Sequence, residues 1–139
     1  MPTCVVGVDP GGTTGLARVY HDAAFQPTLD QVDEAGGEKV PVLQNAVGTM
    51  RFIEHVWPRL VIVEDFNSSG NLSRYGKDTI FLVGYVVGAC NEAGIPVVIA
   101  QPAQRRSELH SLQDRGLSTH KTDALAHAMA HLRRERRGK

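Results

Sequence analysis

The stretch Thr3-Cys4-Val5-Val6-Gly7-Val8, followed directly by Asp9-Pro10-Gly11-Gly12, decides the fold of this 139-residue chain. The apolar run predicts a short strand, and the proline and glycines after it break the strand into a turn. An extended pattern resumes over residues 16–20, so the two segments are expected to pair as a hairpin. A third strand is expected around residues 28–34, before Gly36 and Gly37 close the region.

Beyond the hairpin, helical and extended patterns alternate. The expected elements are a helix over 40–56 with Pro41 in its first turn, a strand over 60–63, a helix over 78–93, a buried strand over 96–100, a short helix after Pro102 and a helix over 119–134. Antiparallel strands first, and alternating strands and helices afterwards, predict one α/β domain over residues 1–139. Its sheet would be mixed and five-stranded, three antiparallel strands and then parallel ones, with helices on both faces.

The composition is that of an ordinary globular protein, with 42% apolar and 22% charged residues. No stretch reaches the roughly 18 to 20 apolar residues that a membrane-spanning helix needs, and the N-terminus has no signal-peptide pattern. Cys4 and Cys90 stand alone, without the spacing of a zinc site, and are expected to be reduced core residues. These features predict a cytoplasmic protein that does not associate with membranes.

The net charge of zero hides an uneven distribution. Residues 22–38 contain five acids and no lysine or arginine, whereas residues 133–139 contain five bases and one acid. A basic C-terminal tail over 133–139 fits a phosphate-rich partner, although such tails also serve only as solubilising ends. Composition and charge leave the function open.

Two acids follow two of the predicted strands, Asp9 after the first and Glu64 after the strand at 60–63. If these strands are parallel neighbours, both carboxylates emerge at the end of the sheet where open α/β folds bind ligands. Two carboxylates held close together repel unless a cation lies between them, and oxygen ligands suit Mg²⁺ or Mn²⁺. The alternative for either acid alone is a turn residue or a solvated strand end. Asp65 points to the opposite face by strand alternation and is expected to be structural.

The last helix carries a third candidate group. Ser118 or Thr119 can cap its start, and an acid in the first turn is favoured by the helix dipole. Four side chains spaced three, four and four residues apart line one stripe of the helix: His120, Asp123, His127 and His131. The first two are better placed for a site at the sheet edge. A zinc pair at His127 and His131 has no supporting cysteine or glutamate pattern, so packing is the favoured role for those two.

These segments resemble the RuvC family of Holliday-junction resolvases. The similar segments are Gly7-Val8-Asp9-Pro10-Gly11, Val63-Glu64, the helix 81–93 with Gly94-Ile95-Pro96-Val97, Gln101-Pro102, and His120-Lys121-Thr122-Asp123-Ala124-Leu125-Ala126. The similarity keeps the motif order over nearly the whole chain. It implies a ribonuclease H-like fold and a metal-dependent endonuclease that cuts four-way DNA junctions by paired symmetric nicks and leaves 5′-phosphates.

Carried over residue by residue, the resemblance makes Asp9, Glu64, His120 and Asp123 the catalytic and metal-binding set, with two Mg²⁺ or Mn²⁺ ions per site. Two departures bear on substrate selectivity. Asp65 stands where the family more often has an amide, and Gln104-Arg105-Arg106 stands where a lysine-bearing DNA-contact motif is expected.

A loop is predicted over residues 67–77, after Glu64. We expect this loop to contact DNA, because it must lie beside the scissile phosphate. Cations there would neutralise phosphates, and an aromatic ring would stack on an unpaired base. The candidate DNA-binding residues are Phe66, Arg74, Tyr75, Lys77, Arg105, Arg106 and Lys121. The alternative is a solvated surface loop.

The helix over 81–93 is apolar on more than one face, which is more than a solvent-facing helix exposes. We expect it to pack against its copy in a homodimer about a two-fold axis. In the alternative, neighbouring loops cover it in a monomer.

Other functions remain open from the sequence. A less selective branched-DNA or RNA/DNA-hybrid nuclease uses the same residues. Asp9-Pro10-Gly11-Gly12-Thr13-Thr14-Gly15 also resembles the phosphate loop of sugar-kinase and actin-like ATPases, which need a second domain that 139 residues cannot supply. A catalytically silent DNA-binding protein would be expected to have lost acids that are present here.

Overall fold

The computed structural model describes residues 3–65 and 74–138. The strands are β1 Thr3–Asp9, β2 Thr13–His21, β3 Pro27–Gly36, β4 Leu60–Glu64 and β5 Val97–Ala100. The α-helices are α1 Val42–Val56, α2 Arg74–Ala93, α3 Arg106–Leu112 and α4 Thr119–Arg137, and two 3₁₀ turns, η1 Pro102–Arg105 and η2 Gln113–Arg115, flank α3.

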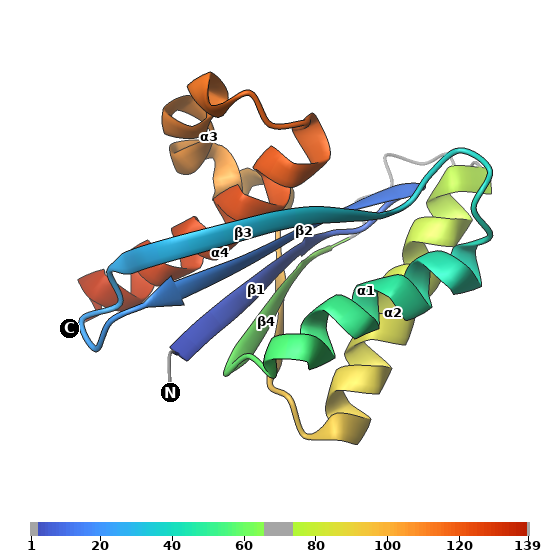
Figure 1. Cartoon of the computed structure of the whole chain (residues 1–139), viewed down its shortest axis with the longest axis horizontal. Helices are drawn as coiled ribbons and strands as arrows, with labels where there is room; N and C mark the ends of the chain where they lie inside the picture. The colour runs from blue at the N-terminus through green and yellow to red at the C-terminus, as the bar shows by residue number, and fades with distance from the viewer. Residues whose placement is uncertain (1–2, 66–73, 139) are drawn as a thin grey trace.

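The sheet is five-stranded with the order β3-β2-β1-β4-β5. β1 pairs antiparallel with β2, and β2 with β3, whereas β1 and β4, and then β4 and β5, pair in parallel. Helices α1 and α2 cover one face, and α3 and α4 cover the other (Figure 1). The predicted fold class, a mixed sheet with helices on both faces, is confirmed.

Strand alternation divides the core into two layers. Val5, Leu60 and Ile62 point toward α4 and pack with its alanines and Leu125. The intervening residues of the same strands, including Val6 and Val61, pack on the other face against α1 and α2. Because β1 and β4 are buried on both faces, neither strand slips easily in register, and this fixes where their carboxyl ends lie.

Helix α4 lies unusually close to the sheet because two strand positions lack a side chain. A Cβ at Gly7 on β1 would overlap the backbone carbonyl of Ala124, and one at Gly15 on β2 would overlap that of His120. The buried alanines of α4, which are small, also permit this close approach. The first turn of α4 is thereby held directly over β1 and β2.

Several predicted boundaries are wrong. Helix α2 begins at Arg74, so residues 74–77 are helical and not part of a loop; arginine, tyrosine and lysine are adequate helix formers, and Gly76 is buried within the turn. Pro41 lies before the first helical residue of α1, and the register is otherwise as expected.

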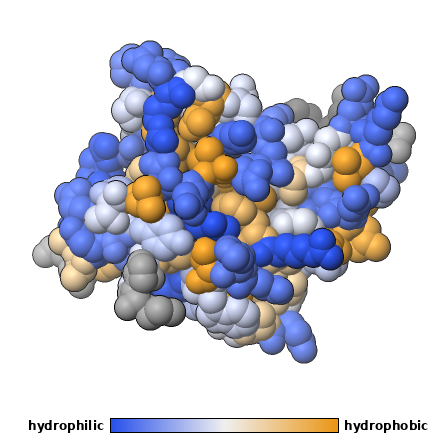
Figure 2. Space-filling view, in the orientation of Figure 1, coloured by the Kyte–Doolittle hydropathy of each residue, from blue (hydrophilic) through white to orange (hydrophobic). Residues whose placement is uncertain are grey.

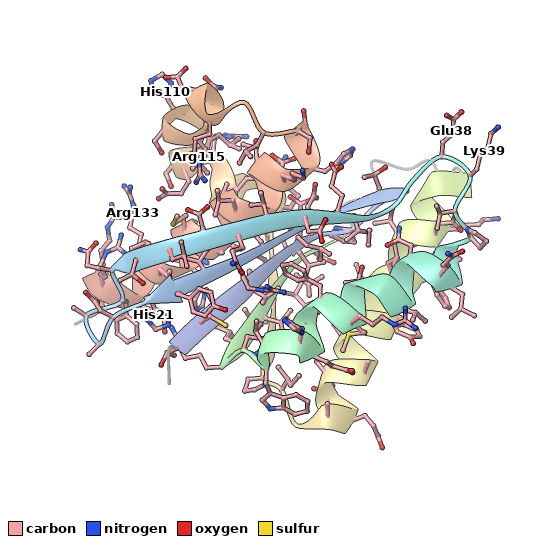
Figure 3. All side chains as sticks on the ribbon, in the orientation of Figure 1. His21, Glu38, Lys39, His110, Arg115 and Arg133 are labelled. Atoms are coloured by element: carbon pink, nitrogen blue, oxygen red, sulfur yellow. The ribbon has the colours of Figure 1, made fainter. Side chains whose placement is uncertain are left out.

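Two elements in the C-terminal part of the chain, β5 and α4, also differ from the prediction. β5 was expected to be buried, but it is an edge strand that pairs only with β4, and Val98 and Ile99 are exposed. The basic segment predicted as a tail continues α4 as far as Arg137, since arginine has high helix propensity and suits the negative end of the helix dipole. Arg133 points toward α3, where it pairs with Glu108 (Figure 3).

Both cysteines are free and buried, as expected from their isolation in the sequence. Burial raises the thiol pKa of Cys4, and it raises that of Cys90 to about 11. Within residues 3–65 and 74–138, no helix is long and apolar enough to span a lipid bilayer.

Candidate active site

Three of the four predicted catalytic residues converge on the carboxyl edge of the sheet by simple topology. Asp9 ends β1 and Glu64 ends β4, and the two strands are parallel neighbours with Val8 opposite Val63. On α4, Ser118 caps the helix by accepting the backbone N–H of Lys121, and Asp123 follows within the next turn. The acids therefore come from three separate elements and meet at one edge.

His120, the fourth predicted residue, faces the same edge. Its Nδ1 lies 3.9 Å from Asp9 Oδ2, and its side chain is 47% exposed. Asp9 is much more deeply enclosed. His120 therefore lies on the solvent side of the site, beside the enclosed carboxylate of Asp9.

A guanidinium group lies between two of the acids. Arg105, the last residue of η1, contacts Glu64 Oε1 through Nη1, and its Nε lies 3.2 Å from Asp123 Oδ1. All three side chains are mostly enclosed. The family resemblance suggested a DNA contact for Arg105; the structure places its side chain within the acidic cluster.

The turn that carries Arg105 is tied to the sheet edge. The side-chain amide of Gln101 donates to Asp65 Oδ2 at 3.2 Å, and the backbone N–H of Asp65 donates to the carbonyl of Ala100 at 2.7 Å. The backbone N–H of Gln101 donates to Oε1 of Gln104, closing the first turn of η1. Asp65 thus orders the backbone beside the site, as its position opposite Glu64 predicts.

His127 is the site residue that sequence reasoning missed. It is 1% exposed, and its Nε2 lies 2.9 Å from Glu64 Oε1. Burial, and then the charge of Arg105, lowers its pKa to about 4, so the ring is neutral and carries one N–H. Its Nδ1 is buried without a hydrogen-bond partner among the described residues, so the N–H belongs on Nε2, where it donates to Glu64. The helical spacing of four from Asp123 was the available signal, and it was assigned to packing.

The surroundings of Asp9 disfavour its charged form. Burial, and then the charge of Asp123, raises the pKa of Asp9 to about 6. The positive charges of Arg105 and His120 offset this only in part. Carboxylates that repel in an enclosed site are the setting in which a divalent cation binds.

The donor set is suited to a hard divalent ion. Three carboxylates and one imidazole at a sheet edge are oxygen-rich, as Mg²⁺ and Mn²⁺ prefer, and no cysteine lies nearby among the described residues. In the described ranges, however, no three acidic, histidine or cysteine side chains converge at the spacing of metal ligands. Arg105 occupies the space between Glu64 and Asp123 and stands where a cation would neutralise them.

The other predicted DNA-binding residues are placed unevenly. Phe66 and the side chains of Arg74 and Tyr75 lie outside the described residues. Lys77 is exposed on the first turns of α2, Arg106 is exposed at the start of α3, and Lys121 is half-buried in the first turn of α4. In the sequence, Arg106 directly follows Arg105, and Lys121 lies two residues before Asp123.

Comparison with known proteins points to one fold. No protein-family model and no curated protein sequence matches the chain. Among solved structures, RuvC of Thermus thermophilus in complex with a Holliday junction substrate matches with a TM-score of 0.76 and 24% identity, covering 98% of this chain and 96% of that one. A second structure of Thermus thermophilus RuvC matches with a TM-score of 0.70 and 22% identity, over 98% of this chain and 97% of the other.

A eukaryotic structure matches as well. The yeast mitochondrial Holliday junction resolvase Ydc2 has a TM-score of 0.62 and 11% identity, with 99% of this chain and 81% of that chain covered. The sheet order, the helices on each face and these superpositions agree, and we conclude that the chain has the fold of the RuvC-like Holliday junction resolvases.

Proposed function

We propose that this protein is a metal-dependent, structure-selective DNA endonuclease that resolves four-way junctions by paired nicks and leaves 5′-phosphates. The observation that carries the proposal is the convergence of Asp9, Glu64 and Asp123, with His120 beside them, at one edge of a RuvC-like fold. The similar structure that contains DNA is a complex with a Holliday junction, which supports a branched substrate for this chain.

Each residue has a distinct task in the proposed reaction. Asp9, Glu64 and Asp123 would hold a pair of Mg²⁺ or Mn²⁺ ions. When bound, such ions would supply Lewis acidity that activates an attacking water and stabilises the leaving 3′-oxygen. His127 keeps the Glu64 carboxylate in one orientation through the 2.9 Å contact to Oε1. His120, exposed and next to Asp9, takes the proton from the water and passes it to solvent.

The positive side chains nearest the acidic edge would hold the DNA backbone. Lys77 and Arg106 are exposed and free to meet phosphates, and Lys121 lies in the first turn of the helix that carries Asp123. The C-terminal basic segment contributes less than its sequence suggests. Arg133 pairs with Glu108, and Arg136 donates to the backbone carbonyl of Phe25 at 2.6 Å.

We also propose that the protein works as a homodimer through α2. Ile80 and Phe81 are 46% and 43% exposed on this helix, and Gly84 and Gly88 continue the same stripe one and two turns later. A Cβ built at either glycine meets nothing within 4 Å. The stripe therefore consists of two protruding apolar side chains, followed by a flat surface where the helix backbone is uncovered. Such a surface lets a second helix approach closely, and a two-fold arrangement provides two active sites for two nicks.

The phosphate-loop alternative is disfavoured by one feature. The cleft of about 390 Å³ beside the loop is lined by Gly11, Gly12 and Thr13, but also by Glu38 and Asp78. Glu38 lies at the end of the molecule where α2 begins (Figure 3). Two acids at the mouth of a phosphate site would repel its ligand. A less selective branched-DNA or hybrid nuclease remains the alternative that a substrate panel separates.

The test is a cleavage assay with a panel of substrates. The purified protein is incubated with Mg²⁺ or Mn²⁺ and, separately, a four-way junction, a flap, linear duplex, single-stranded DNA and an RNA/DNA hybrid. We expect paired nicks in the junction that DNA ligase reseals, which shows 5′-phosphates, and no cleavage by Asp123→Asn. Equal cleavage of flap and junction would favour the less selective nuclease, and no metal-dependent cleavage of any substrate would refute the proposal.

A further inference from the structure

The position of Arg105 is not explained by metal binding or by DNA binding alone. Its guanidinium contacts Glu64 through Nη1 and lies 3.2 Å from Asp123 through Nε, so one cation bridges two acids from different elements. Among the lysine and arginine side chains that the structure describes, no other forms an ion pair with any of the three acids. Arg105 is therefore the principal positive charge inside the cluster.

This contact is built into the fold. The side chain of Arg105 is 23% exposed, which distinguishes it from the neighbouring Arg106 on the outside of α3. Its backbone is fixed by η1, which Gln101 ties to Asp65 at the end of β4. The same edge that presents Glu64 thus also presents the arginine that neutralises it.

A divalent metal ion and the Arg105 guanidinium exclude each other at the carboxylate oxygens of Glu64 and Asp123. A metal ligated by Glu64 and Asp123 needs direct bonds of about 2.0–2.2 Å to carboxylate oxygens that the guanidinium now contacts. A divalent ion and a guanidinium in the same enclosed space also repel each other.

We propose that Arg105 is an internal counter-cation that holds the acidic cluster together when no metal is bound and competes with the metal ion for Glu64 and Asp123. The inference rests on the proposed metal-dependent function. On this account Arg105 is a positioning residue: it keeps the acids close and limits metal affinity, and metal binding requires it to leave them.

The test is direct measurement of Mn²⁺ binding in the absence of DNA. Chelator-treated wild type, Arg105→Ala, Arg105→Gln and Arg105→Lys are titrated with Mn²⁺, and free ion is followed by electron paramagnetic resonance. Loss of the two ion pairs that Arg105 forms with Glu64 and Asp123 is expected to lower the Mn²⁺ dissociation constant about tenfold or more in the Ala and Gln variants. Arg105→Lys keeps the charge but lacks the planar fork, so its affinity should fall between.

Arg106→Ala is the matched control, because it removes the same charge from the adjacent residue without removing a contact to the acids. Salt screening limits its effect to about threefold or less at physiological ionic strength. A second readout is thermal stability: Mn²⁺ should raise the melting temperature more in Arg105→Ala and Arg105→Gln than in wild type at equal ion concentration. This readout also shows whether each variant is folded.

Unchanged or weaker Mn²⁺ binding in both Arg105→Ala and Arg105→Gln would overturn the inference, and so would an equal gain in Arg106→Ala. The proposed function is judged separately by junction cleavage. A wild type that cleaves junctions while its Arg105 variants bind Mn²⁺ like wild type refutes only the competition. A protein with Arg105-dependent Mn²⁺ binding and no nuclease activity refutes only the function, and an absence of Mn²⁺ binding in wild type and variants alike refutes both.

Discussion

Asp9 is an acid of the site whose pKa departs clearly from its ordinary value. It ends a strand that is buried on both faces, and its carboxylate is enclosed next to another acid. Burial and the charge of Asp123 raise its pKa to about 6, whereas an unfolded aspartate titrates near 3.9. The folded protein therefore binds this proton more tightly than the unfolded chain does, and the associated stability is present below about pH 4 and lost as the pH rises through 6.

Replacing Asp9 with asparagine should accordingly stabilise the metal-free protein at neutral and higher pH. At pH 8 we expect Asp9→Asn to increase the free energy of unfolding by up to about 3 kcal/mol, and at pH 4 by little. Urea denaturation in the presence of chelator at the two pH values measures the difference. Asp114→Asn, at an exposed position of η2, is the control. A destabilised Asp9→Asn at pH 8 would show that the carboxylate is compensated better than its surroundings indicate.

A second residue-scale prediction concerns His127. If its N–H orients Glu64, His127→Ala should lower kcat for junction cleavage about 10- to 100-fold, as loss of a hydrogen bond to a metal ligand commonly does. KM for the junction should stay unchanged, because the buried ring cannot reach DNA. His127→Gln retains a donor and should recover part of the rate. A variant that loses only stability, with kcat intact, would reduce His127 to a packing residue.

At the scale of elements, the placement of α4 over the sheet determines the site, because α4 carries His120, Asp123 and His127. The approach depends on the missing side chains of Gly7 and Gly15, which face the helix backbone directly. A backbone carbonyl cannot rotate away as a side chain does. The distance between α4 and the sheet is therefore set by two glycines that contact the backbone of the helix and have no catalytic side chain of their own.

Gly7→Ala should push α4 away from the sheet and separate Asp123 from Asp9. We expect a loss of about 3 kcal/mol or more in unfolding free energy, at the upper end of overpacking costs, and a loss of cleavage that saturating metal does not restore. Gly48→Ala is the control: it adds the same methyl group within α1, where the nearest atom lies at 3.5 Å, and should stabilise the helix slightly. Near-wild-type stability and activity in Gly7→Ala would mean that α4 has room to move.

The elements also show what the sequence can and cannot predict. The alternation around Val5 and Ile62, and the capped start of α4, are local patterns, so β1, β4 and the acids at their ends could be located from the sequence. The contacts of Arg105 and His127 with Glu64 join residues 41 and 63 positions apart, and no local pattern encodes them. The exposure of β5 depends on which strand lies at the edge of the sheet, which is also a property of the whole fold.

At the scale of the whole molecule, the surface is mostly hydrophilic on the face shown in Figure 2, with hydrophobic residues in separate areas. The stripe on α2 differs from these separate hydrophobic areas because its residues form a continuous line along one helix. They are Ile80, Phe81, Gly84 and Gly88. The proposed reaction cuts two strands of a junction, and Asp9, Glu64 and Asp123 would form a single cutting site on each chain. Under that proposal, paired nicking would depend on this surface as much as on the acids.

If the proposed dimer forms through α2, Phe81→Glu should convert it to a folded monomer, since a charge on the stripe would be buried without a partner. Sedimentation equilibrium at micromolar concentration measures the mass, and we expect the variant to nick one strand of a junction without coordinating the second cut. Leu29→Glu is the control, because Leu29 is also exposed but lies on β3, away from α2. A wild type that sediments as a monomer with or without DNA would rule out the α2 interface.

The two buried cysteines bear on how such experiments can be carried out. Cys4 and Cys90 are the only cysteines of the chain, and burial holds both thiols protonated at neutral pH, so neither offers a thiolate to an alkylating dye. A cysteine introduced at an exposed position such as Gln44 on α1 would then be the one site that maleimide reagents modify in the folded protein. Single-molecule fluorescence of subunit exchange and junction bending is therefore accessible without first removing the native thiols.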